Sequence, residues 1–492
     1  MHLRHLFALL STALAADDGG ALTPPRGWRS WNQFNGAVTH DDIVRAIHGL
    51  TDRSRLVDGV PTSLADLGYG DVGIDDGWQQ CGHYGPHSYR YHDAAGRPVV
   101  APKFPSLLNL TRLAASLGLT MSWYANACGC VAAGQCCSDH CDSVECFLQD
   151  VDATLAYGFS GLKVDGCGAQ RDIALWYGLL RQRRAAGAAP VLLEQCHDDD
   201  GLPQGNAPRR DEYGALWCPF HLYRVSGDAG PLYGALLSNL NATRALAARQ
   251  LSLPGCWAYA DMLEVGVYDG KGLPQKASKN NEHDPGLSRE EMRTNYAAWA
   301  IVSSPLILST DINNETIMDI IWPIIANREA IAINQAWAGH SGSVFKKSGI
   351  NIELDQVNYA KLQKYRKVAN SEYQVPMRDP MIAPSYEYYY KPLEKHGAKT
   401  AVLMMNHGHA HTRSEARKHS PFVADQEVDL TLHFKDIPGV SCTRCHVRDV
   451  WRKRDLGDFD GSYVAKGVAP HAAPFLVITP SATTVRDNAL VP

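Results

Sequence analysis

The sequence lacks the features that mark nucleic-acid-binding and membrane-spanning proteins. Its 492 residues carry 47 Lys and Arg against 52 Asp and Glu, and neither sign gathers in a long run. A net charge of −5 offers no basic surface for nucleic acid or anionic lipid. No stretch approaches the roughly 18–20 consecutive apolar residues of a membrane-spanning helix. We therefore expect neither a nucleic-acid partner nor a membrane partner.

Two common enzyme signatures are incomplete, and there is no internal repeat or low-complexity tract. Residues 166–168 (GCG) are followed by Arg171, where a dinucleotide-binding loop would carry its third glycine. Residues 339–343 (GHSGS) lack the last glycine of a nucleophile elbow. The sequence therefore favours neither a doubly wound dinucleotide-binding sheet nor a serine hydrolase.

The amino terminus indicates an exported protein. Residues 1–16 combine Arg4, a short apolar stretch and a small-x-small cleavage site, which predicts a secretory signal peptide. We expect the protein to enter the secretory pathway and to be secreted or held in a lysosome- or vacuole-like compartment. Three glycosylation acceptors agree with export: Asn109, Asn241 and Asn314.

The cysteines favour disulfides over a metal site. Of the 13 cysteines, six gather in one loop between residues 128 and 146, in spacings that fit no familiar zinc pattern. Cys442 and Cys445 form a C-x-x-C pair with no second such pair to complete a zinc site. In an exported chain, disulfides are the favoured interpretation. The odd count leaves at least one thiol unpaired within a monomer.

Apolar runs and helical segments alternate eight times between residues 22 and 340, and most of the runs end in a polar residue or an acid. This pattern predicts a (β/α)8 TIM barrel with its active site at the carboxyl-terminal rim of the strands. Strands are expected within residues 25–31, 69–78, 119–124, 161–165, 190–194, 223–228, 257–261 and 304–310, and helices within 41–68, 106–117, 144–157, 172–186, 235–252 and 289–302.

The composition changes near residue 340. Residues 341–492 carry short β-prone runs separated by Gly, Pro and Asp, which predicts a C-terminal antiparallel β-sandwich domain. Residues 350–380 fit neither part well and are expected to form an inserted loop.

Two acids at strand ends are candidates for reacting groups. Asp165 ends the buried run at residues 161–165, and Lys163 projects from the same face, where its charge would keep the acid ionised. Asp228 ends another such run. Glycosidases hold two carboxyl groups about 5–5.5 Å apart when they retain anomeric configuration, and about 6.5–9.5 Å apart when they invert it. The alternative is that Asp165 is a solvated turn residue that caps the next helix.

Other side chains near these strand ends suit sugar binding. Arg224 can form a forked contact with hydroxyl groups or with a carboxylate. The adjacent acids Asp75 and Asp76 can accept hydrogen bonds from two neighbouring hydroxyl groups. Four aromatic residues offer flat faces for a pyranose ring, with core packing as the alternative for each: Trp31, Trp78, Tyr124 and Trp257.

Taken together, these motifs resemble glycoside hydrolase family 27, the α-galactosidase (melibiase) group that includes α-N-acetylgalactosaminidases. The resemblance covers about residues 24–340 and 385–480. The family patterns appear as residues 27–31 (G-W-x-x-W), 74–78 (I-D-D-x-W), 163–167 (K-x-D-x-C) and 224–228 (an arginine four residues before an acid). The family's D-P-D-M-L segment appears as residues 259–263, in which only the second acid, Asp261, is kept.

The resemblance implies a retaining double displacement without metal or organic cofactor. Asp165 would be the nucleophile and Asp228 the acid/base, acting on a small galactoside. Family disulfides suggest the pairs Cys196–Cys218 and Cys167 with Cys128 or Cys130. The implied substrate-binding residues are Trp31, Asp75, Asp76, Tyr124, Lys163, Cys167, Glu194, His197, Arg224 and Asp261.

One loop departs from the family. Its galactosidases read C-E-W after the fifth strand, where residues sense the group on sugar carbon 2, whereas residues 193–198 read LEQCHD. If the cysteines align, His197 takes the glutamate position and Glu194 precedes the cysteine. An α-galactosidase is expected. The alternatives are an α-N-acetylgalactosaminidase, a β-L-arabinopyranosidase and a non-catalytic sugar-binding protein, and a homodimer is an open alternative to a monomer.

Overall fold

The computed structural model describes residues 19–81, 91–126, 144–165, 173–196, 208–231, 233–267, 286–354, 381–408 and 427–481. The predicted signal peptide lies outside these residues. So do most of the predicted insertion (355–380) and all of the clustered cysteines except Cys146.

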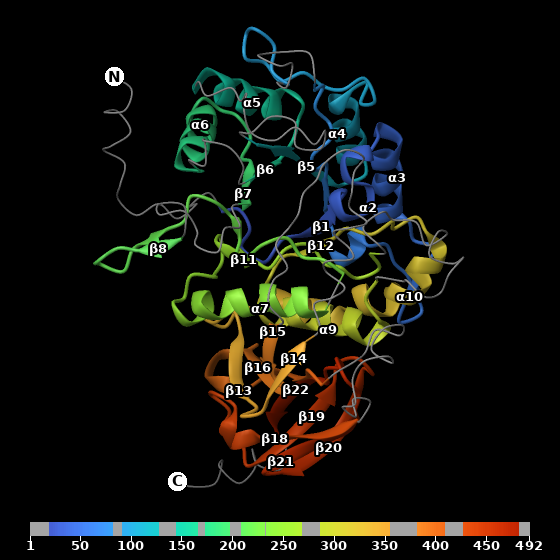
Figure 1. Ribbon diagram of the computed structural model, residues 1–492, viewed down its shortest axis with the longest axis vertical. Coiled ribbons are helices and arrows are strands. Elements are labelled where there is room, and N and C mark those ends of the chain that lie inside the picture. Colours follow the sequence, from blue (N-terminus) through green and yellow to red (C-terminus); the bar gives the residue numbers. More distant parts are fainter. Residues whose placement is uncertain are drawn as a thin grey trace, which may run out of the picture.

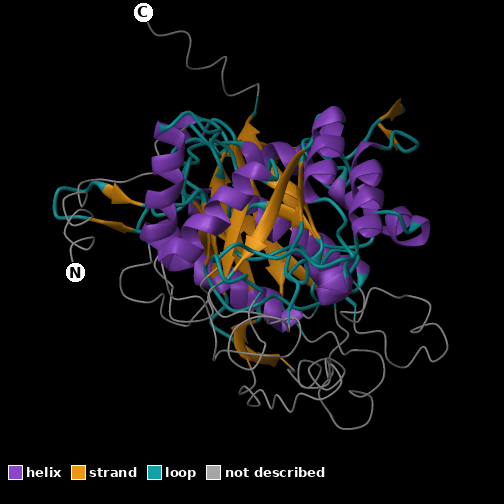
Figure 2. Cartoon of the chain, turned by 90° about the horizontal axis from the view of Figure 1, so that it is seen from above, coloured by secondary structure: helices purple, strands orange, loops and turns teal. Residues whose placement is uncertain are grey.

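The first part of the chain is an eight-stranded parallel barrel. The strands follow the spatial order β11-β10-β7-β6-β5-β4-β1-β12, and a parallel bridge between Leu263 and Leu308 joins the two ends of the sheet. Figure 2 shows these strands enclosed by helices. The predicted (β/α)8 barrel is confirmed. Its strands are β1 (Arg26–Arg29), β4 (Asp71–Gly73), β5 (Thr120–Ala125), β6 (Gly161–Asp165), β7 (Leu192–Cys196), β10 (Leu222–Arg224), β11 (Trp257–Tyr259) and β12 (Leu306–Leu308).

At the start of several barrel helices, side chains satisfy the free backbone N–H groups. The Ser106 hydroxyl accepts from the Asn109 N–H at the start of α4, and Ser288 and Glu291 form a capping box at the start of α9. The helices are α2 (Trp31–Phe34), α3 (His40–Thr51), α4 (Leu107–Ser116), α5 (Val144–Ala156), α6 (Ile173–Ala185), α7 (Tyr233–Ala248), α9 (Arg289–Ile301), α10 (Glu315–Ile325) and α11 (Arg328–Gln335).

The helix predicted over residues 41–68 is wrong in its second half. Helix α3 ends at Thr51, and the chain then forms a hairpin of β2 (Leu56–Val57) and β3 (Val60–Pro61). Asp58 and Gly59 both adopt positive φ, 51° and 82°. An Asp-Gly pair at two such positions favours a tight β-hairpin turn, and this local preference overrides the apolar spacing.

The C-terminal part is an antiparallel β-sandwich, as predicted. A six-stranded sheet with the order β13-β16-β17-β22-β19-β20 packs on the β18–β21 pair, and side chains such as Val402 and Leu432 from the two sheets share one apolar cluster. The strands are β13 (Ser343–Lys347), β14 (Asn351–Leu354), β15 (Met381–Pro384), β16 (Tyr386–Pro392), β17 (Thr400–Asn406), β18 (Val428–His433), β19 (Arg444–Asp449), β20 (Arg454–Asp460), β21 (Ser462–Val468) and β22 (Phe475–Pro480).

Helices α7 and α9 lie between the barrel strands and the sandwich (Figure 1). Helix α9 packs on β16 and β17, and α7 packs on β13. A set of buried and partly buried charged and imidazole side chains crosses this boundary, and we call it the interface cluster. It consists of Arg244, Glu291, Glu387, His407 and His471.

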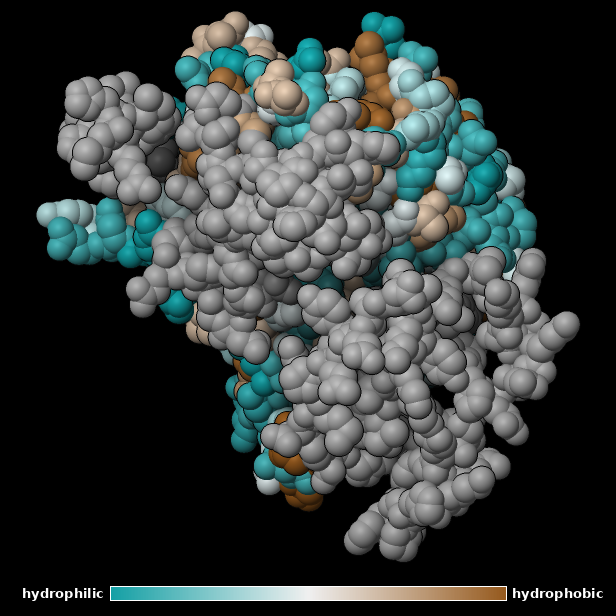
Figure 3. Space-filling model, turned by 45° about the horizontal axis from the view of Figure 1, so that its top comes forward, coloured by the Kyte–Doolittle hydropathy of each residue, from teal (hydrophilic) through white to brown (hydrophobic). Residues whose placement is uncertain are grey.

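Hydrophilic residues dominate the coloured surface in Figure 3, with small hydrophobic patches between them. A hairpin of β8 (Arg209–Arg210) and β9 (Leu216–Trp217) projects from the barrel (Figure 1), and Tyr213 at its turn is exposed. Among the described helices, none combines the length and apolar character needed to cross a membrane.

Candidate active site

Polar side chains gather where the barrel strands end. Asp165 and Cys196 end the adjacent strands β6 and β7 and are partners in the sheet register. Tyr124 lies near the end of β5, Asp75 comes shortly after β4, and Arg224 ends β10. Because the strands are parallel, these residues meet at one rim of the barrel, which is where barrel enzymes carry their active sites.

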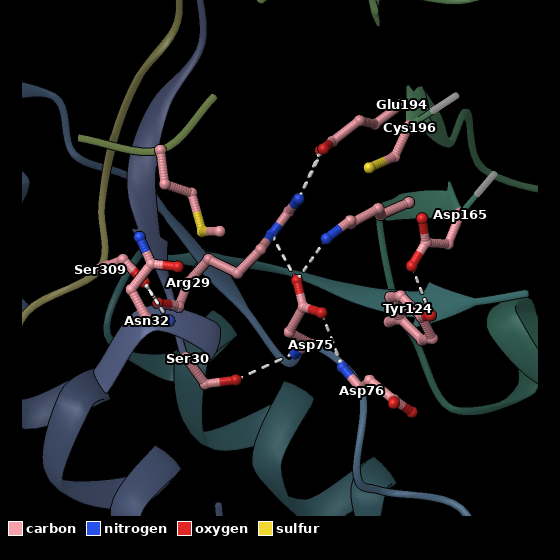
Figure 4. Close-up of polar contacts among 12 residues, drawn as sticks. Arg29, Ser30, Asn32, Asp75, Asp76, Tyr124, Asp165, Glu194, Cys196 and Ser309 are labelled. Atoms are coloured by element: carbon pink, nitrogen blue, oxygen red, sulfur yellow. Dashed lines mark hydrogen bonds and ion pairs between the residues drawn. The ribbon is translucent and has the colours of Figure 1, made fainter. Parts of the chain in front are cut away.

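The Asp165 carboxylate is held by a tyrosine from the neighbouring strand. The Tyr124 hydroxyl donates to Oδ2 of Asp165 at 2.6 Å (Figure 4). The same hydroxyl accepts from the side-chain amide of Asn126 at 3.1 Å. Burial and the Asp165 charge raise the pKa of Tyr124 well above its usual value, so the hydroxyl keeps its proton. Asp165 itself is only partly buried. Tyr124 therefore orients a carboxylate that remains accessible at the rim.

Lys163 donates its hydrogen bond to Asp75, although Asp165 is closer to it in sequence. Its Nζ donates to Oδ2 of Asp75 at 2.8 Å, and both side chains are buried. Burial alone would lower the pKa of Lys163, but the charges of Asp75 and Asp165 outweigh it and raise this pKa. Lys163 thus stays charged near both Asp75 and Asp165, and it donates its hydrogen bond to Asp75.

Asp75 and Asp76 form a buried acid pair with an unusual charge environment. Oδ1 of Asp75 accepts from the Asp76 N–H at 2.8 Å, and Oδ1 of Asp76 accepts from the Gly77 N–H at 2.9 Å. Oδ2 of Asp76 is buried and has no hydrogen-bond partner in the described part of the chain. Burial, followed by the charge of Asp75, raises the pKa of Asp76 to about 7. An acceptor of this kind can take a hydrogen bond from a hydroxyl group.

Asp228 lies on a loop, because β10 ends at Arg224 and is shorter than predicted. Its side chain is 58% exposed, and its Oδ1 lies 3.2 Å from Nη2 of Arg224. The same Nη2 lies 3.1 Å from Oδ2 of Asp261, which also accepts from the Ala229 N–H at 2.7 Å. Asp261, with a positive φ of 83°, thereby holds the loop that carries Asp228. Nη1 of Arg224 lies 3.5 Å from Sγ of Cys196, so this guanidinium links Asp228 to the end of β7.

The aromatic residues predicted as sugar platforms differ in burial. Trp31, at the start of α2, is partly buried and packs against an apolar cluster that includes Tyr259 and Met262. Trp78 is fully buried and stacks on Trp123. Trp257 is also buried, and it begins β11, so it lies at the opposite end of the strand from the rim. For Trp78 and Trp257 the predicted sugar platform is therefore wrong, and they are core residues.

Glu194, an expected sugar ligand, is already paired. Its carboxylate oxygens lie 2.7 and 2.6 Å from Nη1 of Arg29, a buried cation on β1 (Figure 4). The sequence interpretation gave Arg29 no role, although a charged residue inside the short apolar strand RGWR was an available signal.

The cysteine pairing also differs from the expectation. Cys218 forms a disulfide with Cys256, and Cys196 is a buried free thiol, so the predicted Cys196–Cys218 pair is wrong. Cys218 and Cys256 precede the adjacent strands β10 and β11, whereas Cys196 points toward Arg224 at the rim. Cys442 and Cys445 form a disulfide, as favoured over zinc.

Two expected site residues, Cys167 and His197, lie outside the described residues, as do Cys128 and Cys130. Within the described ranges, no group of three or more His, Cys, Asp or Glu side chains is arranged to hold a metal ion.

Comparison with known families identifies this scaffold. A family model described as alpha galactosidase A matches residues 23–336, and one described as the alpha galactosidase C-terminal beta sandwich domain matches residues 383–478. The chain belongs to the α-galactosidase family, glycoside hydrolase family 27. The family's members are glycoside hydrolases.

Individual relatives of the family carry more than one specificity. The chain is 28% identical to alpha-galactosidase 3 of Arabidopsis thaliana over 345 residues, which span 69% of this chain and 66%, just under two thirds, of that protein. It is 27% identical to alpha-N-acetylgalactosaminidase of Gallus gallus, over 69% of this chain and 76% of that protein.

Solved structures support the fold. Alpha-galactosidase I from Mortierella vinacea superposes with a TM-score of 0.64 at 21% identity, covering 95% of this chain and 99% of that one. A family 27 β-L-arabinopyranosidase from Geobacillus stearothermophilus superposes with a TM-score of 0.67 at 15% identity, covering 94% and 97%.

Proposed function

We propose that the protein is a retaining exo-glycosidase that hydrolyses terminal α-D-galactosyl residues of oligosaccharides or glycoconjugates. One observation carries the proposal. The barrel is that of family 27, and at its rim Asp165, at the end of β6, accepts a hydrogen bond from Tyr124. The exposed Asp228 is connected to the same rim by the Arg224 guanidinium, which contacts both Asp228 and Cys196. Two carboxyl groups on one sugar-sized site are what glycoside hydrolysis requires.

In the first step, an oxygen of Asp165 attacks the anomeric carbon. The bond from that carbon to the leaving oxygen breaks, and Asp228 gives its proton to the leaving oxygen. In the second step, Asp228 takes a proton from water, the water oxygen attacks the same carbon, and the bond to Asp165 breaks. Two inversions return the starting anomeric configuration. The exposure of Asp228 suits this exchange with water.

The remaining residues of the rim would bind the galactosyl ring. Asp75 and Asp76 would accept hydrogen bonds from adjacent hydroxyl groups, with the partnerless Oδ2 of Asp76 as one acceptor. Lys163 would hold Asp75, and the face of Trp31 would pack on the ring. Cys167, His197, Arg224 and Asp261 complete the proposed set.

A second candidate is α-N-acetylgalactosaminidase activity. The Gallus gallus relative matches about as well as the Arabidopsis enzyme. Glu194, one of the two expected sensors of the carbon-2 substituent, is paired with Arg29 and does not favour either sugar.

The proposal includes entry into the secretory pathway through the signal peptide at residues 1–16, with a barrel over 22–340 and a sandwich over 341–492. The disulfides Cys218–Cys256 and Cys442–Cys445 support an oxidising compartment.

The test compares turnover of a chromogenic α-galactoside by wild type and by Asp165→Asn. We expect wild-type turnover and its loss by about a thousandfold or more in the variant, because the nucleophile is gone. Asp152→Asn, which changes an acid on the outer helix α5, should match wild type. Equal turnover by wild type and Asp165→Asn would rule out the assigned nucleophile. The same assay with an N-acetylgalactosaminide and a β-L-arabinopyranoside decides the specificity.

A further inference from the structure

Arg29 is a buried cation beneath the candidate sugar site. Its side chain is 7% exposed, and Nη1 contacts both carboxylate oxygens of Glu194, whose side chain is 4% exposed. A buried ion pair gains little stability over apolar residues of similar size, because both charges lose their hydration. A contribution to stability therefore does not account for the Arg29–Glu194 pair.

The chain is built to accommodate this arginine. Gly73 is its partner in the register between β1 and β4, and a Cβ at Gly73 would lie 2.8 Å from Nε and 3.2 Å from Cγ of Arg29. Only glycine leaves room for the stem of the side chain. The Arg29 carbonyl accepts from the Ser309 hydroxyl at 2.7 Å, and the same hydroxyl accepts from the Asn32 N–H at 2.9 Å (Figure 4). Both the backbone and the side chain of Arg29 are thus fixed.

Lys163 contacts Asp75 and not Glu194, the acid opposite it on the neighbouring strand. Lys163 and Glu194 are direct partners in the register between β6 and β7, so Glu194 is the carboxylate that the ammonium would be expected to meet. Instead Glu194 is neutralised by Arg29, and Nζ of Lys163 donates to Asp75 at 2.8 Å. Nε of Arg29 lies 4.0 Å from the same Asp75 oxygen. Asp75 is therefore held between cations from β1 and β6.

We infer that Arg29 is a positioning residue for sugar binding: by neutralising Glu194 it leaves Lys163 to hold Asp75 in the orientation that receives the sugar hydroxyl groups. This inference rests on the proposed function, in which Asp75 is a sugar ligand. Without Arg29, Glu194 competes with Asp75 for Lys163. Since Asp75 would contact the sugar in both the ground state and the transition state, its displacement raises KM more than it lowers kcat.

The test uses Arg29→Met, Arg29→Met/Glu194→Met and Arg29→Lys on a chromogenic α-galactoside. We expect Arg29→Met to raise KM about tenfold or more, with a smaller change in kcat. The double variant removes the competitor and should return KM to within about threefold of wild type. Arg29→Lys keeps a charge beside Glu194 and should give an intermediate KM. Arg183→Met, which breaks an outer ion pair with Asp152, is the matched control and should leave KM unchanged.

The rescue by the double variant separates positioning from a loss of packing. Loss of packing alone would lower the melting temperature of Arg29→Met and would leave KM impaired in the double variant as well. A positioning role predicts instead that KM recovers in the double variant, whatever its melting temperature.

The outcomes distinguish this inference from the proposed function. A wild type without turnover overturns the proposed function. An active wild type with an unchanged KM in Arg29→Met, or a double variant as impaired as the single one, overturns the positioning role alone. If Arg29→Met does not fold, Arg29→Lys carries the test, and a KM equal to that of wild type overturns the inference.

Discussion

The molecule has two buried groups of charged side chains, and they are arranged in opposite ways. At the barrel rim, burial and neighbouring acids raise the pKa of Asp76 to about 7, and burial raises the pKa of Asp261. At the interface cluster, burial alone would raise the pKa of Glu291 and Glu387, but hydrogen bonds from His471 and His407 outweigh it and lower both. At the rim, Asp76 lies beside a second acid, Asp75, whereas the interface pairs each acid with a base.

This difference in pairing indicates that the rim acids suit ligand binding, whereas the interface acids contribute to stability. A carboxylate that is buried beside another carboxylate costs stability and persists where a ligand or a reaction uses it. A carboxylate that is paired with imidazole or guanidinium joins two elements. In the interface cluster, Nδ1 of His471 lies 2.6 Å from Glu291, and the Tyr233 ring stacks on His471 at 3.7 Å. These contacts fix the sandwich against α7 and α9.

The largest expected effect is at the rim, in Asp228→Asn. For an α-galactoside with a poor leaving group, we expect kcat/KM to fall by about 10²–10⁴-fold, because the acid/base is removed. With a dinitrophenyl leaving group, which needs no proton, the first step should be much less affected. A steady-state comparison of the two substrates checks this. An equal loss with both substrates would contradict the assignment of Asp228 as the acid.

At the interface, Glu387→Gln should act on stability and leave the chemistry intact. Breaking a buried pair with Arg244 and His407 should cost about 3–5 kcal/mol of unfolding free energy, with kcat of the folded fraction unchanged. Because the pKa of Glu387 is lowered in the folded protein, this contribution is lost as the pH falls through that pKa. The cost should therefore shrink on acidification, which denaturant titrations at two pH values measure.

The control for that variant is Lys346→Gln. It breaks a half-exposed pair with Asp436 and should cost no more than about 1 kcal/mol. An equal cost for Lys346→Gln and Glu387→Gln, or a loss of kcat in Glu387→Gln, would remove the distinction between the two regions.

Somewhat smaller than the loss expected for Glu387→Gln is a gain in stability expected for Asp76→Asn. The pKa of Asp76 is about 7 in the folded protein against 3.8 ordinarily, so wild-type stability falls as the pH rises between these values. Asp76→Asn avoids this fall and should be more stable than wild type by about 2–4 kcal/mol at pH 7.5, with little difference near pH 4. Sugar affinity should fall at the same time. A stability difference that does not grow with pH would show that the acid pair is not strained.

The sequence predicted what depends on periodicity and on the order of motifs. Strand β6 has the predicted bounds, residues 161–165, because the short run that carries Leu162 and Val164 is bounded by a glycine and by an acid. Helix α5 agrees with its expected range to within one residue. The hairpin at residues 56–61 was missed because its Asp-Gly turn was overlooked within an apolar spacing that also fits a helix.

What the sequence could not predict is which charged groups pair across the barrel. Glu194 was expected to face the sugar, but its partner Arg29 is 165 residues away in sequence and meets it only once the barrel closes. The charge of Lys163 was expected to act on Asp165, two residues along the same strand, but nothing in the sequence indicated that its hydrogen bond goes to Asp75, 88 residues away. The Cys218–Cys256 disulfide follows from the neighbouring strands β10 and β11, which spacing alone does not reveal.

The most direct test of the central claim is to identify the residue that becomes glycosylated. Incubation with a slowly turned-over 5-fluoro-galactosyl fluoride, followed by proteolysis and mass spectrometry, locates the covalent adduct. We predict one added 5-fluorogalactosyl group per chain, bound to the Asp165 carboxylate after the anomeric fluoride leaves, and no adduct in Asp165→Asn. An adduct on any other residue, or its formation in Asp165→Asn, would contradict the account.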